Sequence, residues 1–312
     1  MADKMATRQA YGDALASLGM QNENIVVMDA DLSGSTMTKV FAKKFPDRFF
    51  NIGIAEQNLY GIAAGMAVSG KTVFASTFAM FAAGRAFEII RNSIGYTGAN
   101  VKICATHAGV TVGEDGGSHQ AIEDIALMRS IPGMTVINPS DGVSAAKLIE
   151  AAASFMGPVY VRLGRMAVPI LYEKDADFDI GKAVTLRNGK DYTIIATGIM
   201  VNEALQAADK LEEKGLSIRV LDMHTIKPLD KEAIIAASNE TKGIVTAEEH
   251  TVVGGLGSAV AEVIVKNRPI PVEFIGIEDV FGQSGKPLEL LREYKLTAED
   301  IVNAVVRLKG RL

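Results

Sequence analysis

Two of the four histidines in this chain lie close together, around an acidic, glycine-rich turn. His107 follows the apolar segment ICAT, and His119 stands near the end of the turn GEDGGSHQ, which spans positions 113–120. Two histidines near acidic residues could bind a metal, but the close ligand spacing of a zinc site is missing. They could instead exchange hydrogen bonds with a polyhydroxylated ligand, with Asp115 accepting from a hydroxyl. The glycines permit a tight turn and a close approach to such a ligand, so we expect a binding site here.

Glu56 stands between a strand-like apolar segment and a helix-like apolar segment, in NIGIAEQNLYGIAAG. This position would leave its carboxylate with little water, which suits proton transfer near neutral pH. A glutamate in the first turn of a helix is also stabilised by the helix dipole without any catalytic role. The residues alone leave both interpretations open.

An aromatic pair lies in the segment STFAMFAAGRAF, where Phe78 and Phe81 are three residues apart. The two rings could stack on a flat heteroaromatic ligand. Aromatic residues at helical spacing more often belong to the core, and nothing in the segment decides between the two interpretations.

Three residues could bind an anion, because guanidinium groups match the geometry of phosphate. They are Arg8 in ATRQAYG, Ser35 in DADLSGST and Arg165 in YVRLGRM. Ser35 could equally cap a short helix. The pattern also does not decide whether Arg162 or Arg165 is the one directed to a ligand.

These residues must be positioned by an alternation of short apolar runs and amphipathic segments, which is typical of parallel α/β sheets. In the first part, the sequence predicts strands at 24–32, 48–55, 71–78, 100–109, 134–140 and 158–165, and helices at 8–19, 57–69, 84–95 and 142–155. In the last part, it predicts strands at 191–198, 217–226, 243–249 and 272–277, and helices at 202–215, 231–239 and 255–265. We expect an α/β protein of two domains, 1–170 and 191–312, each with a mostly parallel sheet flanked by helices, joined by a charged linker at 171–190. Ligands would bind at the carboxyl ends of the strands.

Composition excludes several classes of function. The net charge of −5 provides no basic surface for nucleic acid. No apolar run approaches the roughly 20 residues of a membrane helix, and the first residues lack the features of an export signal. The single cysteine, Cys104, rules out an intrachain disulfide and is expected to be a buried, inert thiol. The sequence therefore predicts a cytoplasmic protein that binds neither nucleic acid nor membranes.

The last part of the chain carries fewer residues that could take part in catalysis or ligand binding. His224 in LDMHTI and His250 in AEEHTV follow predicted strands, and structural or interface roles are favoured for both. The turn GGLGS at 254–258 precedes a predicted helix and has a shape that could take an anion. It lacks the full dinucleotide fingerprint, so NAD is not expected.

Taken together, these blocks resemble the transketolase family over essentially the whole chain. The segments DADLSGST, NIGIAEQN, FASTFAMFAAGRAF, ATHAGVTVGEDGGSHQ and RLGR occur in the order found in its pyrimidine-binding domain. The segments TIIATG, LDMHTIKPLD and AEEHTVVGGLGSAV resemble the C-terminal domain that follows. The blocks IAEQN and GEDGxxHQ are highly specific in combination.

The resemblance implies roles for individual residues. In that family thiamine diphosphate is the cofactor, and a two-carbon ketol unit passes from a ketose phosphate to an aldose phosphate, as in the pentose phosphate pathway. Glu56 matches the glutamate that activates the aminopyrimidine ring, and the resemblance makes Glu56, His119 and His107 the catalytic residues. The cofactor would be bound by Glu56, Phe78, Phe81, Asp31 and Leu32. The sugar phosphate would be bound by Arg8, Ser35, His107, Asp115, His119 and Arg165, with Asp115 at a hydroxyl and His119 near the reacting carbonyl.

Two departures from the family pattern matter. Ala75 stands where some relatives have a further aromatic residue, so one wall of the ring pocket could be built differently. The Gly-Asp-Gly turn of the family's diphosphate-binding domain is absent from the 312 residues, and the chain itself is expected to supply no metal ligand. The resemblance therefore implies a split transketolase, in which a second, N-terminal subunit holds the diphosphate and Mg²⁺. Two copies of each chain would form an α2β2 assembly.

Three alternatives remain open at this stage. The β chain of a 2-oxo acid dehydrogenase has the same two domains, but a small oxo acid does not need the polar lining of GEDGGSHQ. A deoxyxylulose-phosphate-synthase-like enzyme normally carries its diphosphate domain in the same chain. A non-catalytic regulatory relative is the third, and the presence of Glu56 with both histidines argues against it.

Overall fold

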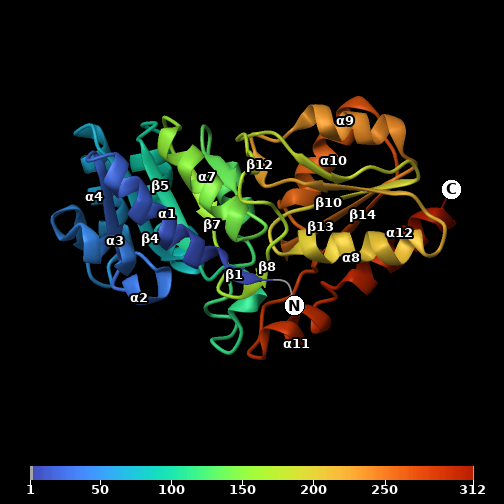
Figure 1. The fold of residues 1–312 in the computed structure, drawn as a ribbon, viewed down its shortest axis with the longest axis horizontal. Coiled ribbons are helices and arrows are strands. Elements are labelled where there is room, and N and C mark those ends of the chain that lie inside the picture. The colour runs from blue at the N-terminus through green and yellow to red at the C-terminus, as the bar shows by residue number, and fades with distance from the viewer. Residues whose placement is uncertain (1–2, 312) are drawn as a thin grey trace.

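The computed structural model describes residues 3–311 and shows two α/β lobes side by side (Figure 1). The N-terminal lobe contains a seven-stranded sheet in the order β12-β6-β7-β5-β4-β2-β3. Its strands are β2 (Ile25–Asp29), β3 (Phe49–Asn51), β4 (Thr72–Phe78), β5 (Val101–Thr106), β6 (Thr135–Ile137), β7 (Val159–Arg162) and β12 (Thr225–Lys227). All neighbours are parallel except β12, which pairs antiparallel with β6. The central strands are buried on both sides, which explains their continuous apolar sequence.

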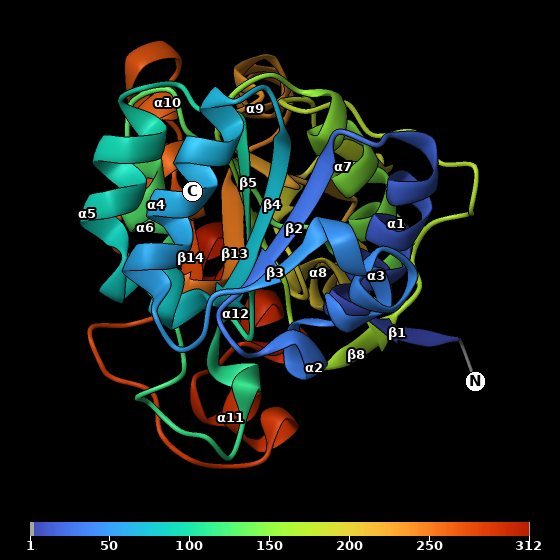
Figure 2. The same cartoon turned by 90° about the vertical axis from the view of Figure 1, so that its left-hand side faces the viewer.

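Helices cover both faces of this sheet (Figure 2). One face carries α1 (Thr7–Gln21), α3 (Lys39–Lys44) and α7 (Gly142–Ser154), which share a core with β2, β5 and β7. The other face carries α4 (Glu56–Val68), α6 (Asp124–Ser130) and the segment between β4 and β5. The short helix α2 (Ser33–Thr36) lies at the carboxyl end of β2. Because the strands are parallel, the segments that follow β2, β4 and β5 meet at one edge of the sheet.

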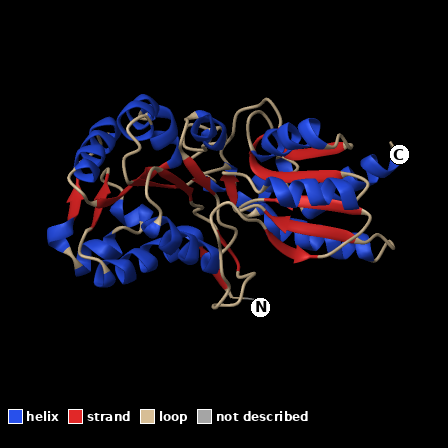
Figure 3. Cartoon of the chain, turned by 90° about the horizontal axis from the view of Figure 1, so that it is seen from above, coloured by secondary structure: helices blue, strands red, loops and turns tan. Residues whose placement is uncertain are grey.

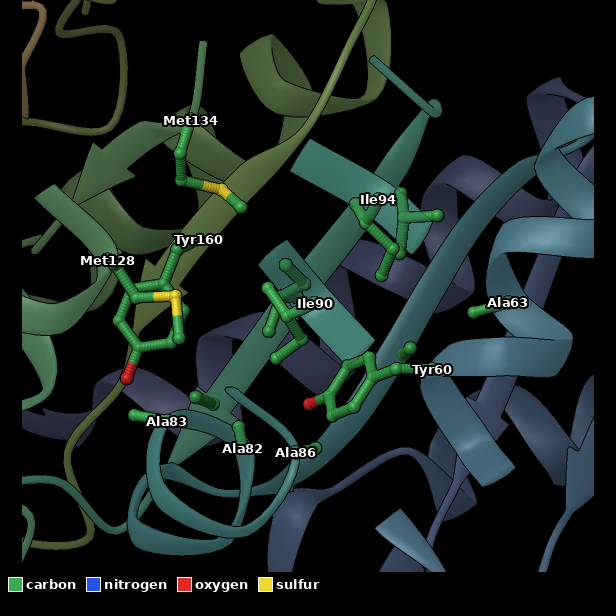
Figure 4. Close-up of a cluster of buried hydrophobic side chains, with 14 of the residues drawn as sticks. Tyr60, Ala63, Ala82, Ala83, Ala86, Ile90, Ile94, Met128, Met134 and Tyr160 are labelled. Carbon is green, nitrogen blue, oxygen red and sulfur yellow. The ribbon is translucent and has the colours of Figure 1, made fainter. Parts of the chain in front are cut away.

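The segment between β4 and β5 is not the regular helix that the sequence predicts over 84–95. It forms a π-helical turn at Phe81–Arg85, a short α-helix α5 at Phe87–Ile89, and a second π-helical stretch at Ile90–Gly95. Ile90 and Ile94 are fully buried in the core that also contains Tyr60 (Figure 4). π-Helical turns add a residue to each turn, shift the faces that side chains present, and are frequent at functional sites.

The C-terminal lobe contains a five-stranded sheet in the order β14-β13-β10-β11-β9. Its strands are β9 (Val184–Arg187), β10 (Tyr192–Ala196), β11 (Ile218–Asp222), β13 (Ile244–Thr251) and β14 (Val272–Ile277), and β9 is the antiparallel one. Helices α8 (Met200–Glu212) and α12 (Ala298–Gly310) pack on one face, and α9 (Lys231–Glu240) and α10 (Leu256–Asn267) pack on the other (Figure 1). Figure 3 shows the strands and helices of both lobes from above. The two-domain α/β fold expected from the sequence is therefore confirmed.

Several elements were not predicted. A two-stranded sheet pairs β1 (Lys4–Ala6) with β8 (Ala167–Pro169), and α6, α11 (Pro287–Glu293) and α12 were also missed. Strand β9 lies inside the segment 171–190 that the sequence predicts to be a linker. These strands are short and lack clear alternation, so local sequence carries little signal for them.

The lobes are joined by side chains and backbone as well as by the linker. Strand β12 belongs to the C-terminal part of the chain but extends the N-terminal sheet. His250 is buried, and its Nε2 atom accepts a hydrogen bond from the Ala126 amide at 3.3 Å. His224 is buried and T-shaped to the Phe178 ring, at 5.4 Å between centroids. Both positions agree with the structural and interface roles that the sequence favours.

Two further expectations concern the interior and the membrane. Cys104 is buried, and burial raises the pKa of its thiol to about 12, as expected of an inert thiol. Across residues 3–311, no helix combines the length and the apolar character needed to cross a bilayer.

Candidate active site

The first part of the site lies where β4 and β5 end side by side. Phe78 is paired in register with Thr106, so His107, one residue later, comes next to the Phe78 ring. The two rings are stacked with their centroids 3.9 Å apart. His107 has a left-handed backbone conformation with φ of 58°, which is uncommon for a residue with a side chain and clusters at functional sites.

The surroundings of His107 keep its imidazole neutral. The side chain is buried, with Nδ1 2.9 Å from the Thr106 hydroxyl and Nε2 3.4 Å from the Arg8 guanidinium. Burial, followed by the charges of Arg8, Arg165 and His119, lowers the pKa of His107 to about 3. The residue can therefore exchange hydrogen bonds with an anion, while positive charge must come from the arginines.

Glu56 is the first residue of α4, and its side chain is only 2% exposed. Its carboxylate receives hydrogen bonds from Arg85, whose Nη1 atom lies 2.9 Å from both oxygens. The Arg85 guanidinium also lies over the Phe81 ring, 4.7 Å from its centroid. The poorly hydrated carboxylate that the sequence predicts is thus present, and it is paired with a half-exposed arginine that the sequence reasoning missed. No signal in the sequence links Arg85 to Glu56, because the two residues are 29 positions apart and the helix predicted over 84–95 gives the Arg85 side chain no direction.

Aromatic rings connect Glu56 and Arg85 to His107. Phe78 and Phe81 are stacked with centroids 5.8 Å apart. The His119 ring is T-shaped to both, with its centroid 5.4 Å from that of Phe81 and 6.4 Å from that of Phe78. Ala75 is fully buried in the core and adds no ring here. The wall therefore consists of Phe78, Phe81, His119 and His107. We call this set, Phe78, Phe81, His107 and His119, the aromatic wall.

At the other end of the wall, Arg8 joins α1 to α2. Its Nη1 atom donates to the Ser35 carbonyl at 2.7 Å. Burial, and then the nearby charge of Arg165, lower the pKa of the Arg8 guanidinium. Ser35 is half-buried within α2 and does not cap the helix. Arg8 and Arg165 place two positive charges near each other, and Arg8 forms no ion pair with a carboxylate among residues 3–311. Such a pair of cations favours a bound anion.

Asp31 and Leu32 follow the end of β2, at the same edge of the sheet. Asp31 is exposed, has a φ of 65°, and accepts a hydrogen bond from the Asn51 side chain at 2.8 Å. Leu32 donates its amide to the Asp29 carboxylate at 2.5 Å. These residues lie beside the site, and none of their side chains contacts the aromatic wall directly through a hydrogen bond in residues 3–311.

The structure separates the two arginines that the sequence could not distinguish. Arg162 is buried and forms an ion pair with Asp124 at 2.9 Å, so it belongs to the interior. Arg165 is partly exposed, and its Nη1 atom lies 3.7 Å from Asp115 and 3.8 Å from Glu114. It also donates to the Val112 carbonyl. Arg165 is therefore the arginine that faces the acidic turn.

The glycines of this turn meet the C-terminal lobe. A Cβ atom at Gly117 would lie 2.5 Å from the Gly282 carbonyl oxygen, and one at Gly116 would lie 2.6 Å from the Ser284 hydroxyl. The sequence suggests that these glycines permit a close approach by a ligand. In the structure, the close approach at these two glycines is made by the chain itself.

The arrangement can bind two kinds of chemical group. A buried carboxylate beside stacked aromatic faces fits a flat nitrogen heterocycle with ring and amino nitrogens. Two arginines near a neutral histidine fit a phosphate. Within residues 3–311, no three His, Cys, Asp or Glu side chains lie close enough together to hold a metal ion, and the acidic turn is used by Arg165 instead.

Comparison with known proteins gives consistent matches over the chain. Residues 3–170 match the model of the transketolase pyrimidine binding domain, and residues 181–301 match that of the transketolase C-terminal domain. A putative transketolase C-terminal section from Methanocaldococcus jannaschii is 55% identical, over 96% of this chain and 95% of that protein. One of the subunits of an apulose-4-phosphate transketolase from Phocaeicola vulgatus is 44% identical, over 96% of this chain and 97% of that protein.

Two further matches show how the chain relates to longer and to solved proteins. Transketolase from Homo sapiens is 43% identical over 97% of this chain, but the match spans only 49% of the human protein. A solved structure described as a split gene transketolase, an inactive beta4 tetramer, is 56% identical and superposes with a TM-score of 0.92, covering 97% of this chain and 98% of that one.

Proposed function

This chain belongs to the transketolase family, and from that premise we propose that it is one subunit of a split transketolase. The complete enzyme would use thiamine diphosphate to transfer a two-carbon ketol unit from a ketose phosphate to an aldose phosphate. The observation that carries the proposal is the buried Glu56 carboxylate, which lies next to the aromatic wall through Arg85 and Phe81.

The residues present fit the pyrimidine part of thiamine diphosphate. Phe78 and Phe81 would contact the faces or edges of the ring, and Glu56 would form a hydrogen bond with a ring nitrogen through a proton shared between the two. Asp31 and Leu32 would lie near the cofactor at the end of β2. When bound, the cofactor supplies the chemistry that breaks and remakes the carbon–carbon bond next to the sugar carbonyl.

Glu56 would activate the aminopyrimidine by sharing a proton with its ring nitrogen. A carboxylate removed from water makes a stronger hydrogen bond than one in solvent. Arg85 holds both oxygens of this carboxylate in the structure, so its side chain would give up part of that contact to the ring nitrogen. Arg85 is 51% exposed, which leaves it room to turn away.

The opposite end of the wall would bind the sugar phosphate. Arg8 and Arg165 would supply positive charge, and His107 and Ser35 would add neutral hydrogen bonds. Asp115 would accept from a substrate hydroxyl, and His119 would lie near the reacting carbonyl. The short distance from His119 to the aromatic rings supports its place between cofactor and sugar.

A second chain would complete the site. The split relatives are about as long as this chain, whereas the human protein is about twice as long. We propose that an N-terminal subunit holds the diphosphate group and Mg²⁺, and that two copies of each chain assemble. The description of the related beta4 tetramer as inactive supports the view that this half needs a partner.

Replacement of Glu56 by glutamine in the two-chain complex tests the catalytic assignment. Glutamine has the same shape but is a poor proton acceptor, so ketol transfer should fall by roughly 10²–10⁴-fold. Glu88→Gln, at an exposed position near Arg85 in the sequence, is the control and should keep full activity. Full ketol transfer by a folded Glu56→Gln complex would show that the assignment is wrong.

A further inference from the structure

The C-terminal lobe reaches into the turn that carries Asp115 and His119. Figures 1 and 2 show this turn beside the segment that leads to α11. Glu249, on β13, is 4% exposed, and its Oε1 atom accepts a hydrogen bond from the Thr111 amide at 2.7 Å. A carboxylate of one lobe therefore holds the backbone of the other lobe four residues after His107.

Other contacts with the C-terminal lobe hold the far end of the segment that begins at Thr111. The Gln120 side chain donates to the Gln283 carbonyl at 2.9 Å, and also to the Val110 and Gly113 carbonyls. The Thr251 amide donates to the Ile122 carbonyl at 2.7 Å. Both ends of the segment are thus fixed by the C-terminal lobe.

The space around Glu249 shows how closely the carboxylate fits the turn. Gly109 has a φ of +79°, and a Cβ atom there would collide with the Glu249 carboxyl group. The Arg162 guanidinium, which pairs with Asp124, also donates to the Glu249 carbonyl at 2.9 Å. Burial raises the pKa of the Glu249 carboxyl to about 7, against the opposing effects of Arg162 and the Thr111 hydrogen bond. A carboxyl kept in such an unfavourable environment needs a compensating contact.

The neighbouring Glu248 is buried to the same degree but faces the other way. Its oxygens accept from the amides of Leu256 and Gly257, at the start of α10. It therefore fills the helix terminus at GGLGS that could have taken an anion. Glu248 stabilises the C-terminal lobe itself, whereas Glu249 acts across the lobes.

We propose that Glu249 is a positioning residue for the sugar-binding turn. By holding the Thr111 amide, it fixes the backbone that presents Asp115 and His119, so the C-terminal lobe contributes to recognition of the sugar. The inference that the turn binds sugar rests on the proposed function. The ordering of the turn by Glu249 is independent of the proposed function, and it can be tested without measuring enzyme activity.

Hydrogen–deuterium exchange on the full chain separates the two glutamates. In Glu249→Ala, amides within 109–120 should exchange roughly 10–100-fold faster, because a buried hydrogen bond of about 1–3 kcal/mol is lost, while 255–258 stay protected. In Glu248→Ala the pattern should reverse. Unchanged exchange in 109–120 for a folded Glu249→Ala, or the same pattern in both variants, would overturn the proposal.

Two further variants keep the test decisive if alanine prevents folding. Glu249→Asp preserves the charge near Arg162 but shortens the side chain by one methylene, so exchange in 109–120 should rise. Glu249→Gln keeps an oxygen that can accept from Thr111, and exchange should stay within about threefold of the natural chain. Wild-type protection in Glu249→Asp, or a loss in Glu249→Gln as large as in Glu249→Ala, would contradict the hydrogen-bond mechanism.

In the two-chain complex, the kinetic effect should appear mainly in sugar binding. Glu249→Asp should raise KM for the sugar phosphate by roughly tenfold, since a displaced turn weakens contacts worth about 1.4 kcal/mol. Glu248→Gln is the matched control and should leave this KM within twofold of wild type. An unchanged KM in Glu249→Asp together with faster exchange would show that Glu249 orders the turn but does not affect recognition of the sugar. Equal KM increases in both variants would show a general loss of stability instead.

Discussion

At the scale of single residues, the site depends on charged and titratable groups that are held away from water. Glu56 is buried against Arg85, and Glu249 is buried against a backbone amide. His107 is buried and neutral between Phe78 and Arg8. Each group contacts specific partners in the interior, so each is more sensitive to substitution than a surface residue of the same type.

The depressed pKa of His107 makes the fold sensitive to acid. The folded state resists protonation to about pH 3, whereas the unfolded chain binds a proton near 6.5. Between about pH 3 and pH 6.5 the unfolded state therefore binds more protons than the folded state. The contribution of His107 to the free energy of unfolding is fully present above pH 6.5 and is lost as the pH falls through this range. Between pH 7 and pH 5 the loss should be about 2 kcal/mol.

His107→Asn tests this expectation, because asparagine tolerates the left-handed conformation and does not titrate. Urea unfolding at the two pH values should show the natural chain losing about 2 kcal/mol more than the variant. Parallel pH dependence in the two proteins would show that His107 titrates normally in the fold.

The sequence revealed some of these residues and not others. The sequence predicts Glu56, Phe78, Phe81, His107 and His119 as site residues because they stand in specific motifs near predicted strands, and their roles stay predictions. Arg85 was missed because the regular helix predicted for its segment gives no reason to direct it to Glu56. Glu249 was missed because its partner, Thr111, is a backbone amide 138 residues away in the chain, and backbone partners leave no mark in the sequence.

At the scale of elements, the residues of the candidate site lie at the carboxyl ends of β2, β4 and β5. Contacts between the two lobes hold the acidic turn in its position. The long apolar strands and most of the long helices were predicted from their patterns, whereas the amphipathic helix α12 was missed. The π-helical turns between β4 and β5, the short pairs β1 and β8, and β9 were not, because their hydrogen bonds depend on tertiary packing rather than on local periodicity.

Asp141 shows how an element is tied to the segment that follows the first lobe. Its carboxylate caps α7 by accepting from the Ser144 amide at 2.7 Å, and it also accepts from the amides of Leu171 and Tyr172. The residue is fully buried. One side chain therefore anchors both the helix and the start of the connection to the C-terminal lobe.

Asp141→Ala should lower the free energy of unfolding by roughly 3 kcal/mol, because three amides lose their acceptor in the interior. Thr297→Ala removes a capping box of similar form at α12, where one amide and the Asp300 side chain are involved. It should cost only about 1 kcal/mol. Equal losses for the two variants in urea unfolding would show that the contacts of Asp141 with 171–172 add nothing.

At the scale of the whole molecule, both lobes contribute to the candidate site. The aromatic wall and the arginines lie at one edge of the N-terminal lobe, and the C-terminal lobe holds the acidic turn in place. The family resemblance, visible in the sequence, is confirmed by both domain matches. The need for a second chain was inferred from the missing Gly-Asp-Gly turn, and it remains a proposal supported by the split relatives.

We propose that this chain contributes one side of a thiamine site that another chain completes, and this proposal can be tested directly. Its most direct test is to titrate thiamine diphosphate with Mg²⁺, and to measure ketol transfer, for this chain alone and for its mixture with the N-terminal subunit. We expect weak binding and no turnover for the chain alone, and tight binding with turnover at one cofactor per pair of chains in the mixture. Tight cofactor binding and ketol transfer by the isolated chain would show that no second chain is needed.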